Sequence, residues 1–230
     1  MKRSTTLTSV AALLWLASSP SQGSVLLTEH GLNIDGDLTT DTAWPSSVDA
    51  SLFDIVTGLG RMSVTVSASG AHLVLAYFDH DIDAETNTFF NELGSVGGVA
   101  PGAGQSWEID EPGFDDPPGD IYDNWANGAL DNSIGFFTPN DVAMALGYDF
   151  ALASGEQAVI TFFTSTVNGA PGFYLRHRDF DSGAELFFWS SIEIGDDGQP
   201  VPEPGSLALL AMGLLALAVR RGPRWQRQMP

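Results

Sequence analysis

Between residues 24 and 200, apolar and polar positions mostly alternate with a period near two. In the stretch RMSVTVS, Met62, Val64 and Val66 fall on one side, and serine and threonine fall on the other, which is typical of a half-buried strand. The stretch HLVLAYF, residues 72–78, is apolar on both sides, as expected of a central strand. Further segments rich in β-branched and aromatic residues follow at 141–152, 157–167, 172–178 and 184–194. Because turn residues separate these segments and none has a helical stripe, residues 24–199 predict one all-β domain, an antiparallel β-sandwich or jelly roll.

The segment 79–140 breaks this pattern, because it contains two stretches rich in Gly, Pro and Asp, GSVGGVAPGAGQ and DEPGFDDPPGD. Loops of that length in a compact domain are commonly functional or mobile. Trp107, Tyr122 and Trp125 lie within this segment. Their rings have two interpretations, as platforms that stack on sugars or as anchors that fix the loops.

The charge of the chain is strongly asymmetric. The sequence has nine basic and 29 acidic residues, but residues 24–200 contain 28 of the acids and three of the arginines, a formal charge of −25. Such a surface repels phosphate backbones, so we expect no binding to nucleic acid. Divalent cations are its natural partners. The chain has no cysteine, which excludes disulfides and thiolate metal sites.

The N-terminus has the pattern of a signal peptide. Lys2 and Arg3 precede an apolar run at 7–17, and the small residues Ser21 and Gly23 suit cleavage after Gly23. The alternative, an uncleaved anchor, needs a longer apolar run than this one.

The C-terminus contains a second apolar run, at 206–219, which four arginines follow. As a helix it would reach about 21 Å, whereas the hydrocarbon core of a membrane is about 30 Å thick. By the positive-inside rule the arginines stay in the cytoplasm, which places the acidic domain outside. The alternative is a buried C-terminal helix of the domain.

The tail at 200–230 has three parts in order, namely a Pro-Glu-Pro motif, the apolar run and a basic cluster. The motif residues are Val201, Pro202, Glu203, Pro204, Arg220 and Arg221. This arrangement resembles the PEP-CTERM sorting signal. The resemblance implies a Gram-negative exporter, transient insertion of the apolar helix into the inner membrane, processing by the protease exosortase near Pro-Glu-Pro, and delivery to the cell surface or beyond. The prolines suit a protease, because they keep the backbone extended. The tail continues past the arginines as GPRWQRQMP, which departs from the usual pattern.

Two weaker resemblances concern the domain itself. The stretch NIDGDLTTDTAW resembles the opening of carbohydrate-binding modules of the family 9 type, at Asp35, Gly36, Asp37, Asp41 and Trp44. A plain structural interpretation is a strand and turn. The segments from 141 to 191 resemble the last strands of many PEP-CTERM surface proteins.

The stretch DHDIDAETNTFF is the clearest metal candidate. Its aspartates alternate like positions 1, 3 and 5 of a calcium loop, but Ala84 and Phe90 stand where an EF-hand has Gly and Glu. A looser calcium site is therefore the hypothesis, and an acidic solvated loop is its alternative. The candidate ligands are Asp79, Asp81, Asp83 and Glu85.

Nothing in the sequence indicates a catalytic centre. The chain has no Gly-x-Ser-x-Gly motif, and its four histidines are not spaced as zinc ligands. We therefore expect a non-enzymatic structural or interaction protein of the exopolysaccharide layer, or biofilm matrix. The alternative is a calcium-dependent carbohydrate-binding module with Trp44, Trp107 and Trp125 as glycan contacts.

Overall fold

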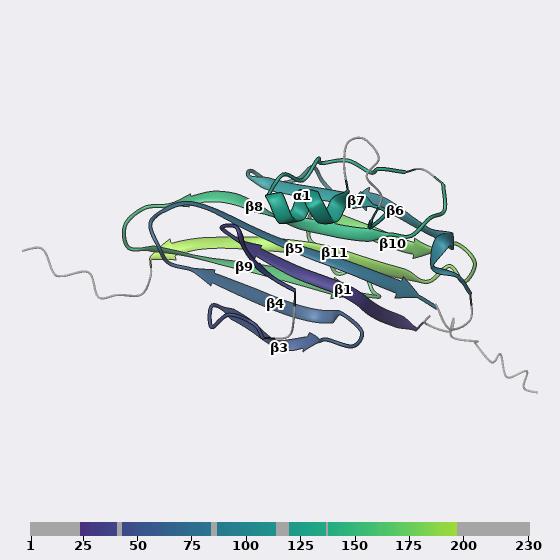
Figure 1. Ribbon diagram of the computed structural model, residues 1–230. Helices are drawn as coiled ribbons and strands as arrows, with labels where there is room; N and C mark the ends of the chain where they lie inside the picture. Colours follow the sequence, from purple (N-terminus) through teal and green to yellow (C-terminus); the bar gives the residue numbers. More distant parts are fainter. Residues whose placement is uncertain (1–23, 41–42, 84–86, 114–119, 137, 197–230) are drawn as a thin grey trace, which may run out of the picture.

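The computed structural model describes residues 24–40, 43–83, 87–113, 120–136 and 138–196. These residues form two antiparallel β-sheets that pack face to face (Figure 1). Sheet A has the order β2 (Asp37–Thr39), β1 (Val25–Ile34), β5 (Gly70–Ile82), β8 (Ala143–Leu152) and β7 (Gln105–Asp110). Sheet B has the order β3 (Val48–Asp54), β4 (Leu59–Val66), β9 (Glu156–Ser165), β11 (Glu185–Asp196), β10 (Tyr174–Asp179) and β6 (Glu92–Gly97). The all-β sandwich predicted from the sequence is confirmed.

The main core lies between the two sheets. Its largest members include Leu32 and Phe78 from sheet A and Met62, Phe162 and Phe188 from sheet B, and each is at most 1% exposed. Met62 belongs to the alternating stretch at 61–67, whose apolar side faces this core as the pattern predicts. Burial of these apolar side chains is the main force that holds the sheets together.

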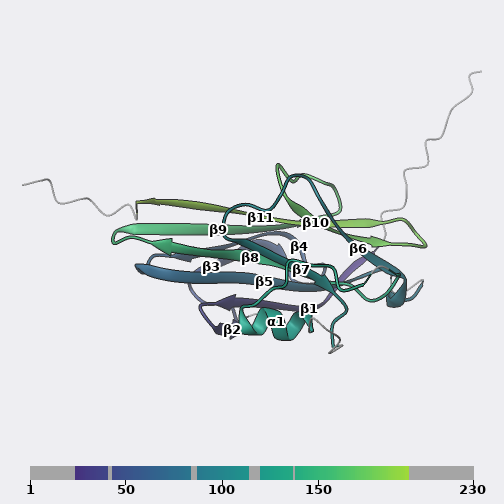
Figure 2. The ribbon, with the colours of Figure 1, turned by 90° about the horizontal axis from the view of Figure 1, so that it is seen from above.

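The central strand β5 is apolar on both sides because both of its faces are covered. Phe78 points into the main core, whereas Leu75 and Tyr77 point to the outer face of sheet A, where they form a second core. Helix α1 (Ile121–Asn127) covers this second core, on the side of sheet A that is opposite to sheet B (Figure 2).

The sequence does not predict α1, because a helix of only seven residues is too short to show a periodic apolar stripe. Its ends are nevertheless well formed. The Asp120 carboxylate accepts a hydrogen bond from the Tyr122 backbone N–H at 2.7 Å, and Gly128 ends the helix with a φ of 71°.

The segment 79–140 is not one long loop. It contains the end of β5, the short helix η1 (Phe89–Asn91), β6, β7 and α1. The expectation of an extended loop region was wrong here, because strands and a helix this short carry little pattern among so many Gly and Pro residues.

The signal segment 1–23 and the sorting segment 200–230 lie outside the described residues. Among the residues that are described, no helix is long and apolar enough to cross a membrane.

Candidate metal site and its surroundings

Three aspartates meet on the outer face of sheet A, where β5 ends. Asp79 and Asp81 are two residues apart in β5, so both point to the same face. Asp141 lies two residues before Ala143, which is the Cα partner of Asp79 across the β5–β8 pair. One carboxylate oxygen from each of the three residues lies within 4.8 Å of the other two. This spacing suits a single oxygen-coordinated cation.

The site is only partly open to water. Asp79 is 9% exposed, and its Oδ1 atom has no hydrogen-bond partner. The Oδ1 atom of Asp141 is likewise buried without a partner. Buried carboxylate oxygens are normally paired, so both atoms carry a desolvation cost that a bound cation would offset.

The electrostatics of the cluster are repulsive. Burial, followed by the charge of Asp141, raises the pKa of Asp79 to about 7. Burial, followed by the charges of Glu92 and Asp81, raises the pKa of Asp141 to about 6, and burial also raises the pKa of Asp81. Each shift means that the site favours a bound proton, or another positive charge, more strongly than an isolated carboxylate does.

No arginine of the described residues shares this face. Arg61, Arg176 and Arg178 alternate along β4 and β10 with buried residues of the main core, so they project from the outer face of sheet B. Arg176 is paired there with Glu185.

The structure brings together two of the four ligands proposed from the sequence. Asp83 follows β5 in a left-handed conformation, with a φ of 59°, and its Oδ1 accepts a hydrogen bond from the Ser24 backbone N–H at 2.7 Å. It is therefore not part of the cluster. Glu85 lies outside the described residues. Asp141 is not among the ligands predicted from the sequence, because only the antiparallel pairing of β5 with β8 places a residue so distant in the chain beside Asp79.

A second group of ionisable residues lies behind the cluster, in the interior. Glu92, His80 and His177 have no exposed surface. Glu92 accepts a hydrogen bond from the Ile82 backbone N–H at 2.9 Å, and its Oε2 lies 2.6 Å from Nε2 of His177. Burial raises the pKa of Glu92 to about 9 and lowers those of His177 and His80 to about 4 and about 3. Burial thus favours the neutral form of each side chain.

These shifts predict how stability depends on pH. A carboxyl group whose folded pKa is raised stabilises the fold at low pH and loses that contribution as the pH rises towards the folded pKa. Asp79 and Asp141 act in this way, and so does Glu108, because burial raises the pKa of Glu108 to about 7. His80 acts in the opposite direction, because burial lowers its pKa and keeps the ring neutral. Glu92 acts like the other carboxyl groups across this range, and His177 acts like His80 but only below its ordinary pKa, so His177 offsets Glu92 only in part.

The carboxyl groups outweigh the histidines. In chelator, we expect the protein to be less stable at pH 8 than at pH 5 by about 2–4 kcal/mol, after allowance for solvent screening. Urea unfolding at the two pH values measures this difference. Equal stability, or greater stability at pH 8, would contradict the assignment of the raised pKa values.

The three tryptophans proposed as glycan contacts do not share a surface. Trp125 has no exposed area and lies in the second core beneath α1, so its ring is an anchor and offers no stacking face. Trp107 is partly buried on β7 beside Phe173, at a ring-centroid distance of 5.7 Å. Trp44 is also partly buried and packs on the main core beside His30, at 5.2 Å.

The stretch that resembles the opening of a carbohydrate-binding module forms a strand and a turn. Asp35 and Gly36, with φ values of 56° and 91°, connect β1 to β2. The Asp35 carboxylate accepts a hydrogen bond from the Leu73 backbone N–H at 2.7 Å, and Nδ1 of His72 lies 2.8 Å from it. Asp37 begins β2, and Asp41 is outside the described residues. The contacts of Asp35 therefore favour the structural interpretation.

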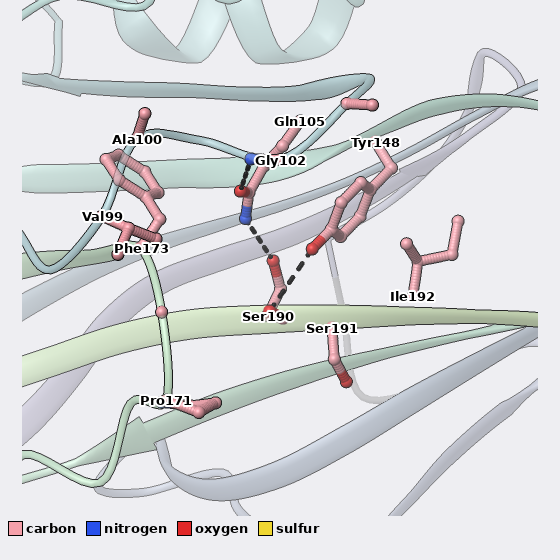
Figure 3. A pocket seen from close by; sticks show the side chains of 12 residues that line it. Val99, Ala100, Gly102, Gln105, Tyr148, Pro171, Phe173, Ser190, Ser191 and Ile192 are labelled. Carbon is pink, nitrogen blue, oxygen red and sulfur yellow. Dashed lines mark hydrogen bonds between the residues drawn. The ribbon is translucent and has the colours of Figure 1, made fainter.

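A groove of about 500 Å³ opens elsewhere, between the sheets (Figure 3). Tyr148, Gln105, Phe173 and Ser190 line it, and all of its lining side chains are uncharged. The Tyr148 hydroxyl donates to the Ser190 carbonyl at 3.3 Å, and the Gln105 amide donates to the Ser190 hydroxyl at 3.1 Å. The sequence does not predict this groove, because its lining comes from four separate parts of the chain.

Comparison with known proteins identifies the tail. Residues 200–222 match the PEP-CTERM protein-sorting motif. No curated protein and no solved structure matches the chain. The chain therefore carries a PEP-CTERM sorting signal, as the resemblance at Pro-Glu-Pro implied. This signal implies processing by exosortase and export to the cell envelope or surface.

Proposed function

We propose that this protein is a non-enzymatic interaction protein of the exopolysaccharide layer, and that its sandwich binds a divalent cation, with calcium as the best candidate. The observation that carries the proposal is the cluster of Asp79, Asp81 and Asp141, whose carboxylate oxygens lie within 4.8 Å of one another. On this proposal the chain is cleaved after Gly23, residues 24–199 form the exported domain, and the tail inserts into the inner membrane only transiently.

Calcium fits the chemistry of the cluster. It prefers six to eight oxygen ligands in a flexible arrangement, and the three carboxylates supply part of that number. Asp81 and Asp141 are partly exposed, so water or an outside carboxylate can complete the coordination. A cation held in this way would link the acidic domain to an acidic polysaccharide, which the net negative charge of the domain would otherwise repel.

The alternative function is a carbohydrate-binding module, and the uncharged groove favours it. Its aromatic and amide side chains suit a sugar, whose rings stack on apolar faces and whose hydroxyls need polar partners. Tyr148 lies seven residues along the chain from Asp141, about 23 Å in an extended strand, and the two sites are on opposite faces of sheet A. A glycan in the groove would therefore not touch a cation at the cluster.

Calorimetric titration of the exported protein with calcium tests the site. We expect saturable binding of one cation, and we expect Asp141→Asn to weaken it at least tenfold because one ligand loses its charge. Glu193→Gln is the matched control, because it removes one charge from an exposed position on sheet B and should leave the affinity within about twofold. Equal binding by both variants, or no binding by the parent protein, would refute a calcium site at these aspartates.

A further inference from the structure

The first described residue of the chain is bound to the far end of β5. The Ser24 backbone nitrogen donates a hydrogen bond to Oδ1 of Asp83 at 2.7 Å, and the Ser24 hydroxyl lies 3.4 Å from the same oxygen. The Asp83 backbone N–H in turn donates to the Ser24 carbonyl at 2.8 Å. Immediately beside this contact, Val25 pairs with Ile82 and begins the β1–β5 ladder.

Asp83 is held in position for this contact by its own backbone. Its φ of 59° is uncommon for a residue with a side chain, although Asp tolerates it better than most. The turn directs the carboxylate back across the end of the ladder, towards the start of β1. The contact thus joins two residues that lie 59 positions apart in the chain.

We propose that Ser24 is the first residue of the mature protein, and that Asp83 is the binding site for its new α-ammonium group. Cleavage adds water across the Gly23–Ser24 peptide bond, so Gly23 leaves with the carboxylate and the Ser24 nitrogen becomes an ammonium group. A single amide donor is thereby replaced by a charged group with three donors, and hydrogen bonds between ionised groups are the stronger kind. Removal of the signal peptide would therefore strengthen the contact between Ser24 and Asp83 at the end of the β1–β5 ladder.

The sequence makes this contact easy to measure. Lys2 is the only lysine in the chain, and it lies in the segment that cleavage removes. The processed protein therefore has one amine, the α-amino group of Ser24. An amine-reactive reagent labels that group alone, and mass spectrometry of the labelled N-terminal peptide identifies both the cleavage site and the extent of labelling.

The experiment uses the full chain, exported by a Gram-negative host from its own precursor and kept in chelator so that no cation affects the result. We expect the mature protein to begin at Ser24. We expect its amine to react about two- to fivefold more slowly at pH 7.5 than that of Asp83→Asn, because the ion pair holds the group protonated. Asp123→Asn, which removes an acid from α1, is the matched control and should react like the parent protein.

A second variant separates the ion pair from a general loss of structure. Insertion of one alanine after Gly23 moves the ammonium group away from Asp83 and leaves the amide of Ser24 in its place. In that background Asp83→Asn should no longer change the labelling rate, although both proteins remain folded by circular dichroism. A mature N-terminus at another residue, or equal labelling of the parent protein and Asp83→Asn, would overturn the proposal.

Discussion

Replacement of Trp125 by alanine is expected to lower the free energy of unfolding by about 3–5 kcal/mol. The indole ring has no exposed surface and packs with Tyr77 and Tyr122 at ring-centroid distances of 5.6 and 5.3 Å. It lies against Gly31, where an added Cβ atom would overlap the ring. The alanine variant would leave a cavity between α1 and sheet A that the short helix cannot fill. Urea unfolding measures the loss.

A second effect adds to the cavity at Trp125. The Asn33 side chain donates hydrogen bonds to the carbonyl oxygens of Trp125 and Ala126 at 2.8 and 3.0 Å, and Asn33 is only 1% exposed. If α1 detaches, this buried amide loses both partners. Leu52→Ala is the control, since Leu52 is 60% exposed and its truncation should cost less than about 0.5 kcal/mol. A stable Trp125→Ala protein would show that α1 is not anchored by this ring.

Replacement of Glu92 by alanine is the second prediction with a large effect, a loss of about 2–4 kcal/mol from a lost buried hydrogen bond and a cavity. The side chain joins β6 to two neighbouring elements, through the Ile82 backbone N–H and through the His177 ring 2.6 Å away. Because the Ile82 N–H and the His177 ring are both buried, the alanine variant would leave an unsatisfied donor and an empty space beside the ring. Thermal and urea unfolding measure the cost.

Glu92→Gln distinguishes loss of the hydrogen bond from loss of a charge. Burial raises the pKa of Glu92 to about 9, so its neutral form is favoured at pH 7 and a glutamine has nearly the same shape and polarity. We expect Glu92→Gln to cost less than half as much as Glu92→Ala. If the two variants are equally unstable, Glu92 acts as a buried carboxylate ion, and our account of its protonation is wrong.

The sequence predicted the fold class but not the second core and the helix α1 that covers it on the outer face of sheet A. Alternation at Met62, Val64 and Val66 reports local geometry, because successive side chains of a strand always point to opposite faces. The second core depends on Trp125 from α1 and on Leu75 and Tyr77 from β5, which the chain brings together from far apart. The pattern within one segment contains no information about contacts between distant segments, so Trp125 had two interpretations, as an anchor and as a platform.

The same limit applies to the candidate metal site. Asp79 and Asp81 were predicted because they are close in sequence, and Asp141 was missed because it is not. Asp83 was included on the strength of the alternating pattern, but β5 has ended by that point and the left-handed turn directs its carboxylate to Ser24. The alternation of Asp residues therefore indicates a shared face only for as long as the strand continues.

The measurement that tests the proposed function most directly is cosedimentation of the exported protein with exopolysaccharide from its own host, with calcium and with chelator. We predict saturable binding in calcium that is lost in chelator and in Asp141→Asn, and that persists in Glu193→Gln. Binding that is unchanged by chelator would favour the uncharged groove and the carbohydrate-module alternative. No binding in either condition would contradict the account of a calcium-dependent partner of this polymer.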